Sequence, residues 1–560
     1  MGRPDHETNG GQLYRQTDET YDGEVAFAGG VSRRAECRAK ERARILGKAS
    51  GKQAIRLRSS GKPGKRRNRN RASAPSVFLH AAARGKGSKS KASRKGQQAV
   101  RRMKIYNQGY KRGYEDGVRQ GKNSFGAVFD GVSIVIPTYN QKDYVLKCVS
   151  SIEKHTPAPY EIIVVDNGSQ DGTANALRRI GGMVRVAALD GNRGFAGGVN
   201  HGLMMAKGRH IVVLNNDTLV TPGWLDNMMA CLQSQADIGV VGPVTNYIGG
   251  EQQIEVPYDD ISGMWAFAAN YNRPDASKHR LTDRLVGFCW LFSRELFERV
   301  GYLDEGYAIG NFEDDDWIVR AKLAGYKLAV AGDAFIHHFG SVSMKAVEEQ
   351  RFAALNKDNE QFYERKWGDP HTLIAEVARM AKEASASFDV GERSEGSADG
   401  RQPFRRSSDF YPEGSFLTDV NGDVYHLSGG CRRKLHIPVP RGISPVRLAK
   451  PDLLGIPVGN AIDSSMQIEG KASDSGQSSA HLLQGSSAEW PEGSVVAANE
   501  APQIWYQISG GKRRKYASAY AAECWGVYPY AVMRVPYEKL HALEEGWPII
   551  APPKLLGCQL

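Results

Sequence analysis

The chain has 560 residues, 24% of them charged, and a formal net charge of +12. Residues 1–104 contain 27 Lys and Arg against 8 Asp and Glu, so this segment carries +19 and the remainder carries −7. No run of about 20 apolar residues and no secretory leader is found, which predicts a cytoplasmic location or a peripheral one at the inner membrane face. The basic segment can bind an anionic polymer or a membrane surface, but charge alone predicts no specific nucleic-acid partner.

The first 131 residues are not expected to form a packed core. Residues 1–104 are rich in Arg, Lys, Ser and Gly, with too little apolar surface to offset the entropy of folding, so we expect a disordered tail. In residues 105–131, Tyr and Gly recur every four residues, which predicts a helix or a linker. The seven cysteines contain no Cys-x-x-Cys pair, which argues against a disulfide framework and a zinc ribbon.

Residues 132–367 read as one α/β domain, because short apolar strands alternate with amphipathic helices. We expect strands at Val132–Pro137, Glu161–Val165, Val184–Leu189 and His210–Leu214. We expect helices at Asp143–Lys154, Gly172–Ile180 and Gly198–Lys207, the last of them capped by Gly208. This order predicts a mostly parallel sheet with helices on both faces and a ligand site at the carboxyl ends of the strands.

The remaining chain divides into a helical or linker segment (368–413), a β-rich repeat (414–463), a flexible linker (464–492) and a second β-rich repeat (493–560). Val424–Lys434 matches Trp505–Lys515, and Val446–Ile462 matches Met533–Ile549, in the same order. Each repeat predicts a β-hairpin. The Arg-Arg-Lys runs and aromatic residues either hold an anionic glycan or belong to plain structural hairpins.

Polar residues follow the first two strands. The first strand runs into Pro137-Thr138-Tyr139-Asn140, and the second ends at Asp166, before Asn167-Gly168-Ser169. A carboxylate at such a strand end can accept hydrogen bonds from a ribose or a base. Taken alone, either motif also fits an ordinary turn.

Two acidic motifs follow. Asn215-Asn216-Asp217 ends the fourth strand with oxygen ligands that suit a hard divalent cation bridging to a diphosphate. Residues 313–316 place four carboxylates ahead of a helix, where they either complement the helix dipole or imply a metal or a raised pKa nearby. A short strand at Lys327–Val330 then leads to His337-His338, one of which can complete a coordination sphere, although a lone histidine is more often a packed one.

A dehydrogenase is the alternative that the glycine-rich stretch from Gly191 to Gly198 raises, because such a loop before a helix can cradle phosphate. A dinucleotide fingerprint should follow the first strand, and the turn there contains no glycine. The pattern therefore disfavours a dehydrogenase.

In order and spacing, these motifs resemble family 2 glycosyltransferases of the GT-A fold, in the branch of rhamnosyl- and galactofuranosyltransferases. The resemblance covers about Val132 to Phe339. It rests on VSIVIPTYN, VVDNGSQDGT, NRGFAGGVNHGL, LNNDT, Gly287-Phe288 leading to Val300–Glu305, NFEDDDW and IHHFGSVS.

The resemblance implies an inverting bacterial enzyme of cell-wall or other polysaccharide synthesis. Such an enzyme moves a hexosyl or deoxyhexosyl group from a nucleotide-sugar donor to a glycan, lipid-linked or other hydroxyl acceptor, with Mn²⁺ or Mg²⁺. The implied site residues are Pro137, Tyr139 and Asp166 for the nucleoside; Asn192, Arg193 and Asn216 for the donor; Asp217 and His338 for the metal, with His337 as the alternative; Asp314 as the base beside Glu313; and Gly287, Phe288 and Trp317 for the acceptor.

One position departs from the family pattern. Asn216 stands where the family has the first acid of the metal-binding pair, which leaves Asp217 as the ligand. This departure keeps a second hypothesis open: a catalytically impaired scaffold that binds polyanions through the tail and the repeats. Of the four clustered acids, only Asp314 matches the base, so we expect replacement of Asp316 to affect transfer far less.

Overall fold

The computed structural model describes residues 127–340, 349–388, 404–463 and 490–556. All of them belong to one compact unit, Ile105–Leu560. The expectations for the basic tail, for most of residues 105–131 and for nearly all of the linker 464–492 lie outside the described residues. Within the part that is described, no helix combines the length and the apolar character that crossing a bilayer requires.

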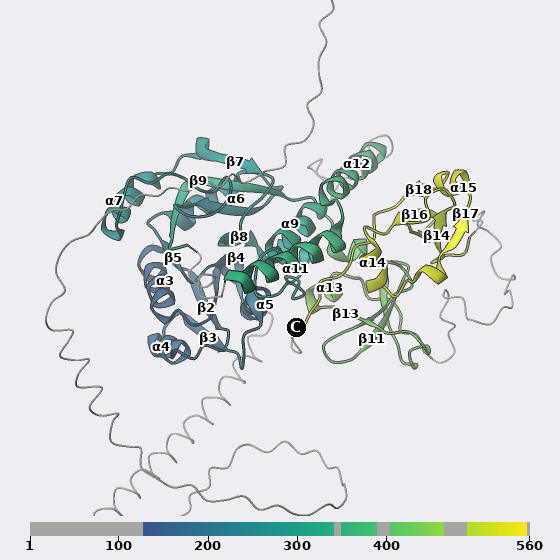
Figure 1. Cartoon of the computed structure of the whole chain (residues 1–560), viewed down its shortest axis with the longest axis horizontal. Helices are drawn as coiled ribbons and strands as arrows, with labels where there is room; N and C mark the ends of the chain where they lie inside the picture. Colours follow the sequence, from purple (N-terminus) through teal and green to yellow (C-terminus); the bar gives the residue numbers. More distant parts are fainter. Residues whose placement is uncertain (1–126, 341–348, 389–403, 464–489, 557–560) are drawn as a thin grey trace, which may run out of the picture. The chain divides into compact units, whose positions relative to one another are not determined.

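A nine-stranded mixed sheet forms the centre of the first domain (Figure 1). Eight strands lie in the order β3 (Val184–Ala188), β2 (Tyr160–Asp166), β1 (Phe129–Thr138), β4 (Gly208–Leu214), β8 (Cys289–Ser293), β6 (Ile238–Val244), β9 (Lys327–His338) and β5 (Thr218–Val220), while β7 (His279–Thr282) also pairs with β9. β3, β2, β1 and β4 are parallel neighbours, as are β6 and β9, whereas β8, β5 and β7 pair antiparallel. Because β8 is antiparallel to both β4 and β6, these two strands point the same way, which confirms a mostly parallel sheet.

Helices cover both faces of this sheet, as the alternation of strands and helices predicts. They are α3 (Lys142–His155), α4 (Thr173–Ile180), α5 (Gly194–Met205), α6 (Trp224–Ser234), α7 (Ile261–Tyr271), α8 (Arg294–Val300) and α9 (Glu313–Leu323). Successive residues of β1 enter different cores: Ile134 packs with residues of α3, α4 and α6, and Val135 with residues of α5, α7, α8 and α9. Side chains of a strand alternate between the two faces of a sheet, so each face has its own apolar core.

Two local expectations are corrected. The helix expected at Gly198–Lys207 is α5, which begins four residues earlier, at Gly194, and ends at Met205 with Ala206 as its C-terminal cap. Gly208 is therefore not the cap but the first residue of β4, where an added Cβ would lie 2.5 Å from the backbone nitrogen of Ser133. Close approach of two strands explains this glycine. The strand expected at Lys327–Val330 continues to His338.

Two long helices and two small sheets follow the first domain. The helices are α11 (Glu349–Trp367) and α12 (Pro370–Phe388). One sheet has the order β12 (Cys431–Lys434), β11 (Val424–Ser428), β10 (Phe416–Thr418), β13 (Val446–Arg447), and the other β17 (Met533–Val535), β14 (Val495–Ala498), β15 (Tyr506–Ser509), β16 (Lys512–Lys515), β18 (Glu544–Glu545). Short helices complete them: α13 (Lys450–Leu454), α14 (Ala519–Cys524) and α15 (Tyr537–His541).

The structure supports the duplication that the sequence indicates. β11–β12 and β15–β16 are antiparallel hairpins, and each turns on two glycines with positive φ, as the two-residue turn requires. A further correspondence joins them: Glu413 accepts a hydrogen bond from the backbone N–H of Gly430, and Glu492 accepts one from that of Gly510. The β-hairpins are therefore confirmed.

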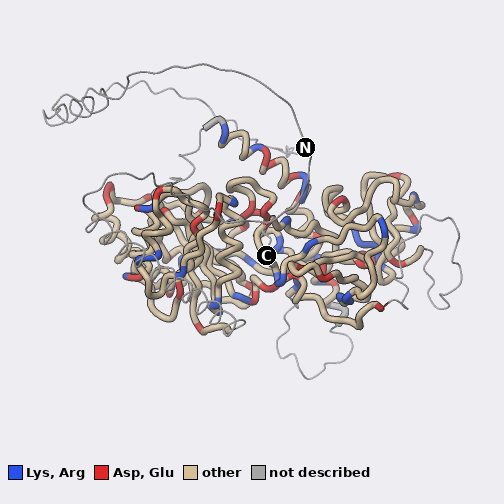
Figure 2. The backbone as a smooth tube through the Cα atoms, turned by 90° about the horizontal axis from the view of Figure 1, so that it is seen from below, with Lys and Arg blue, Asp and Glu red and all other residues tan. Residues whose placement is uncertain are grey.

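Most charges of the Arg-Arg-Lys runs have partners within the protein. Arg513 donates to the carbonyls of Leu540 and Leu543, and Arg514 donates to those of Asp409 and Tyr411, just before the first repeat. Acidic and basic residues are interspersed along the described backbone (Figure 2). These contacts favour structural hairpins over an open basic surface.

Candidate active site

The loops after β1 and β2 meet at the carboxyl edge of the sheet. Thr138 and Asp166, the last residues of the two strands, lie opposite each other in register. The backbone N–H of Asn140 donates to the Ser169 hydroxyl at 2.7 Å, and the N–H of Gln170 donates to the Asn140 side chain at 2.9 Å. The two loops therefore hold each other in place.

The expected donor residues gather at this edge. Asp166 is buried, and its Oδ1 accepts a hydrogen bond from the N–H of Ser169. Pro137 belongs to β1, and Tyr139, one residue beyond the strand, is 40% exposed. Arg193 is exposed at the start of α5, and the Asn192 side chain accepts a hydrogen bond from the N–H of Gly194.

Asn167 joins these two groups, although the sequence did not single it out. Its Oδ1 accepts a hydrogen bond from the N–H of Arg193 at 3.2 Å, and its Nδ2 donates to the carbonyl of Gly194 at 2.8 Å. The loop before α5 is thus fixed to the end of β2. The position of Asn167 directly after Asp166, at the end of β2, was the one sequence feature that could have indicated this role.

Asp217 and His338 come together where β5 meets β9. Thr218 pairs with His338 in the antiparallel register, so the preceding residue, Asp217, lies beside the histidine. The distance from Asp217 Oδ1 to His338 Nε2 is 3.2 Å, and both side chains are about 95% buried. The structure thus brings the two expected metal ligands together from positions about 120 residues apart in sequence.

Hydrogen bonding fixes the orientation of the His338 ring. Nδ1 lies 2.8 Å from the carbonyl oxygen of Tyr247, which can only accept, so Nδ1 carries a proton. In the neutral ring, Nε2 then presents a lone pair toward the Asp217 carboxylate, and this nitrogen is buried without a hydrogen bond. Backbone orientation of a histidine through its other nitrogen is typical of metal ligands. A cation or a proton between the two groups would give Nε2 a partner.

These two ligands make an incomplete coordination sphere. Among the residues that the structure describes, no three His, Cys, Asp or Glu side chains group closely enough to share an ion. Asn216, the departure from the family pattern, is buried, and its Nδ2 donates to the Thr138 hydroxyl at 3.0 Å. The donor set of one carboxylate and one imidazole fits Mn²⁺ or Mg²⁺ only with further oxygen ligands from substrate or water.

His337, the alternative ligand, faces away from Asp217. Its Nδ1 lies 2.8 Å from the hydroxyl of Tyr258, and its ring packs at 4.8 Å from that of Phe339. Burial, followed by the neighbouring His338, lowers the pKa of His337 to about 4. Neighbouring residues of a strand point to opposite faces, so only one of the two histidines can meet Asp217.

Asp314 lies in the first turn of α9 and has an unusual environment. Its Oδ2 accepts a hydrogen bond from the N–H of Gly287 at 3.0 Å, and its Oδ1 accepts one from the N–H of Asp315. Burial, followed by the charge of Asp315, raises the pKa of Asp314 to about 6. A carboxylate with such a pKa can take up a proton near neutral pH.

Gly287 and Phe288 connect the base with the metal pair. Gly287 donates to Asp314, while the ring of the next residue, Phe288, stacks on His338 with centroids 5.4 Å apart. These two residues precede β8, whose first residue lies opposite Leu214, so they also stand at the carboxyl edge of β4. The two centres are therefore held by adjacent residues of one loop. Phe288 is itself buried.

The two acids on either side of Asp314, Glu313 and Asp315, have different surroundings. Glu313 is buried, and burial together with Asp314 raises its pKa well above the ordinary value. Asp315 forms a bidentate pair with the exposed Arg284, at 2.8 and 2.9 Å. The cluster thus combines two buried acids of raised pKa with one that is paired at the surface.

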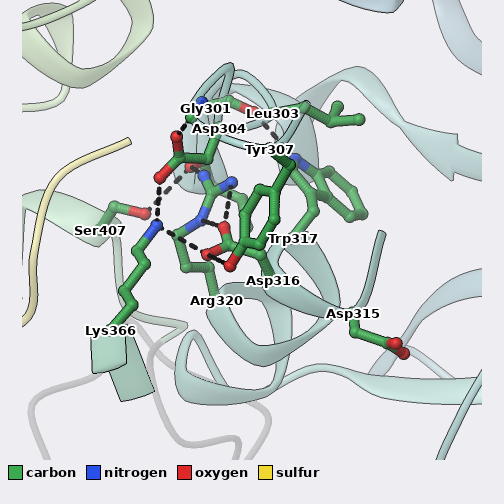
Figure 3. A network of polar contacts seen from close by, with 12 residues as sticks. Gly301, Leu303, Asp304, Tyr307, Asp315, Asp316, Trp317, Arg320, Lys366 and Ser407 are labelled. Atoms are coloured by element: carbon green, nitrogen blue, oxygen red, sulfur yellow. Dashed lines mark hydrogen bonds and ion pairs between the residues drawn. The ribbon is translucent and has the colours of Figure 1, made fainter. Parts of the chain in front are cut away.

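Asp316 has a structural environment (Figure 3). Its carboxylate lies 2.6 Å from Lys366 Nζ and 3.0 Å from Arg320, and it accepts a hydrogen bond from the Trp367 indole at 2.9 Å. Burial alone would raise its pKa, but Lys366 and Arg320 outweigh burial and lower it. Replacing Asp316 would remove the carboxylate that the buried Arg320 contacts and would leave Lys366 with Asp304 alone, so its loss affects stability, a cost that the sequence did not indicate.

Trp317 does not stand at this edge. Its indole is fully buried, donates to the carbonyl of Gly301 at 2.9 Å and stacks on Trp290. Its ring packs in the apolar core on one face of the sheet, with residues of α5, α7 and α8. The expected acceptor contact of Trp317 is therefore corrected to a core contact.

Comparison with known proteins finds similarity over part of the chain. The family described as "Glycosyl transferase family 2" matches residues 133–301. Glycosyltransferase AglE of Haloferax volcanii is 26% identical over 214 residues, which are 37% of this chain and 66% of AglE. Glycosyltransferase GlyG of Streptococcus pneumoniae is 32% identical over 119 residues, which are 21% of this chain and 40% of GlyG. The chain thus spans less than two thirds of the length of either relative.

One solved structure that the chain matches is the mannosyltransferase PcManGT from Pyrobaculum calidifontis, in complex with GDP-Man and Mn²⁺. It is 19% identical, with a TM-score of 0.30, over 48% of this chain and 77% of that one. The family match begins in β1 and includes Asp166, Arg193 and Asp217, and it ends before Asp314 and His338. Residues 133–301 are thus the part of the chain that is similar to glycosyl transferase family 2.

Proposed function

We propose that this protein is an inverting glycosyltransferase that moves a sugar from a nucleotide-sugar donor to a hydroxyl acceptor. One observation carries the proposal: adjacent residues, Gly287 and Phe288, contact Asp314 on one side and His338 on the other. The proton acceptor, Asp314, therefore lies close to the pair of His338 and Asp217, which would hold the cation beside the leaving diphosphate. Both lie at the edge where ligands of such sheets bind.

The donor occupies the loops after β1, β2 and β3. Asp166 accepts hydrogen bonds from the nucleoside, and Pro137 and Tyr139 pack against the base. Asn192 and the exposed Arg193 approach the diphosphate, close to the first turn of α5, whose N–H groups favour negative charge. Asn216, beside Asp217, completes this side of the donor site.

Asp217 and His338 hold a divalent cation, Mn²⁺ or Mg²⁺. When bound there, the cation neutralises charge that develops on the leaving diphosphate. The protein contributes the geometry, because the carbonyl of Tyr247 fixes the His338 ring and leaves Nε2 toward Asp217.

Asp314 acts as the general base, with Glu313 beside it. It removes the proton of the acceptor hydroxyl, whose oxygen forms a bond to the anomeric carbon while the bond from that carbon to the diphosphate oxygen breaks. Nucleoside diphosphate leaves from the opposite face, so one displacement inverts the anomeric configuration. The N–H of Gly287 aims the carboxylate of Asp314 and stabilises its charged form.

The acceptor is a glycan, a lipid-linked sugar or another hydroxyl compound of cell-wall or surface polysaccharide synthesis in a bacterial cytoplasm. We assign the sugar to the hexosyl or deoxyhexosyl class, as in the rhamnosyl and galactofuranosyl branch that the motifs resemble. The basic tail, residues 1–104, places the enzyme on an anionic polymer or on the inner membrane face.

The test is release of nucleoside diphosphate from a panel of UDP-, dTDP- and GDP-sugars, with and without Mn²⁺ and with a mixture of simple glycoside acceptors. We expect release from at least one donor, dependent on the cation. Absence of release from every donor, together with salt-sensitive binding of polyanions, would instead favour the scaffold hypothesis.

A further inference from the structure

The loop between Tyr307 and α9 has a backbone that side chains rarely adopt. Ile309, Asn311 and Phe312 have φ angles of +62°, +77° and +73°, and none of them is glycine. Residues with a Cβ are disfavoured in this region, so three of them within four positions persist only if the surroundings impose the conformation. The cap of α9 gives no such support, because Phe312 has no side-chain cap hydrogen bond.

One buried side chain of α11 imposes it. The Oδ1 atom of Asn359 accepts a hydrogen bond from the N–H of Ala308 at 2.9 Å. Its Nδ2 atom donates toward three carbonyl oxygens, those of Ala308, Gly310 and Asn311, at 3.0, 2.9 and 3.1 Å. Asn359 is 2% exposed. Only a primary amide can accept at one atom and donate twice at the other from this position.

The loop touches the donor side of the site as well as the base. The carbonyl of Ile309 accepts a hydrogen bond at 2.7 Å from the N–H of Phe195, two residues after Arg193. An added Cβ on Gly194 would lie 3.3 Å from the Ile309 nitrogen, so the two backbones are in contact. At its other end the loop leads through Phe312 directly into the turn that carries Asp314.

The C-terminal end of α11 also contacts the first turn of α9. Lys366 contacts both Asp316 and Asp304 at 2.6 Å, and the indole of Trp367 donates to Asp316 (Figure 3). α11 therefore fixes the start of α9 at two points, one buried ion cluster and one amide. Of these two points, only the amide contacts the strained loop, and it is the one that bonds its backbone.

We propose that Asn359 is a positioning residue of sugar transfer: by holding the loop 308–312, it sets Asp314 relative to Arg193 and the donor. It acts through the loop and not on the reacting atoms. The chemical consequence rests on the proposed function, whereas the support of the loop does not depend on it.

The experiment compares three variants of the full-length chain. Asn359→Leu removes the amide and keeps the branching and the number of side-chain heavy atoms, and Asn359→Asp keeps the acceptor but replaces the donor with a charge that faces three carbonyls. Asn356→Leu is the matched control, because Asn356 lies one turn earlier on α11 and accepts a hydrogen bond only from the side chain of Asn311. Hydrogen exchange by mass spectrometry reports on the loop, and nucleoside diphosphate release and donor calorimetry report on the site.

We expect Asn359→Leu to raise amide exchange in residues 306–315 while exchange in β1, β2 and β4 stays unchanged. The rate of transfer should fall about 10- to 100-fold, with donor affinity changed far less, because misplacement of a base lowers the chemical step. Asn359→Asp should behave alike, and Asn356→Leu should stay within about twofold of the parent.

Either of two results in the exchange experiment would overturn the proposal. One is a folded Asn359→Leu protein whose loop exchanges as slowly as that of the parent, and the other is uniform loosening of the whole domain, which would make Asn359 merely structural. An unchanged transfer rate despite a loosened loop would also contradict it. If the parent releases no nucleoside diphosphate from any donor, the proposed function fails, and the exchange data alone still decide whether Asn359 holds the loop.

Discussion

At the scale of single residues, Asp314 is distinguished from its neighbours by what its carboxylate contacts. Two backbone N–H groups bind it, whereas Asp315 pairs with Arg284 and Asp316 lies within the cluster of Lys366 and Arg320. A buried carboxylate without a cationic partner in contact keeps a raised pKa, which suits proton transfer.

Asp314→Asn should lower the transfer rate by about 10² to 10⁴, because it keeps the shape of the side chain and removes the proton acceptor. Donor affinity, measured by calorimetry, should stay near that of the parent. Asp315→Asn is the matched control, since its carboxylate is held by Arg284 at the surface, and it should cost little. A near-normal rate in Asp314→Asn would remove the assignment of the base.

The pH dependence of kcat/KM follows from the same residue. The base works only when ionised, and its pKa is raised to about 6, so kcat/KM should fall as the pH drops through about 6 and reach a plateau above it. The profile should be recorded between pH 4.5 and 8 with Asp315→Asn as a comparison. A flat profile down to pH 4.5 would show that no such group is needed.

Asp217→Asn should abolish metal-dependent turnover without unfolding the domain. The substitution removes the charged oxygen opposite His338 Nε2, and an amide is a poorer ligand for a hard cation. Circular dichroism tests the fold, and a Mn²⁺ titration followed by thermal unfolding tests binding apart from activity. Full turnover of the parent in excess chelator would contradict a metal requirement.

At the scale of elements, the sheet depends on how closely β4 approaches β1. Gly208 is buried between them, and an added Cβ would meet the backbone at Ser133 and Gly131 within 2.8 Å. Backbone atoms cannot rotate away as a side-chain end can. Gly208 begins β4 beside Phe129, at the edge of the sheet opposite the candidate site, so the expected effect is on stability.

Gly208→Ala should therefore destabilise the protein by about 1–3 kcal/mol, as an overpacked core position does. The measurement is thermal or urea unfolding. Gly191→Ala provides the control, since nothing lies within 4 Å of its added Cβ and its φ is not positive. Equal unfolding midpoints for the two variants would mean that β1 and β4 can separate at no cost.

At the scale of the whole molecule, charge and fold are separated along the chain. The tail of residues 1–104 carries +19, while the remainder carries −7. Every residue that forms the candidate site lies between Pro137 and His338, and Asn359 supports it from α11.

Deletion of residues 1–102 should leave turnover of a small acceptor within about twofold, because the first strand begins only at Phe129. Affinity of the full chain for an anionic polymer or anionic vesicles should fall steeply as salt rises, and the truncated chain should lose it. Loss of soluble protein on truncation would place the domain boundary nearer the N-terminus.

The sequence by itself determined the α/β alternation, the strand ends that carry Asp166 and Asp217, and the acidic turn at residues 313–316. These signals are local, because strand and helix periods and turn residues act over a few positions. The resemblance to the family implied roles for residues at this edge of the sheet, but it did not show which of them are in contact. The insertion of the antiparallel β8 between β4 and β6 was not foreseen, since pairing is a long-range choice.

Only the tertiary structure decided which of two histidines and which of four acids face the site. The register of β5 on β9 sets His338, rather than His337, beside Asp217, and one residue of slip would exchange them. Asp316 is turned to Lys366, 50 residues away, and Asn359 reaches its loop from a similar distance. Contacts between residues so far apart in sequence depend on how the helices pack, which no local pattern encodes.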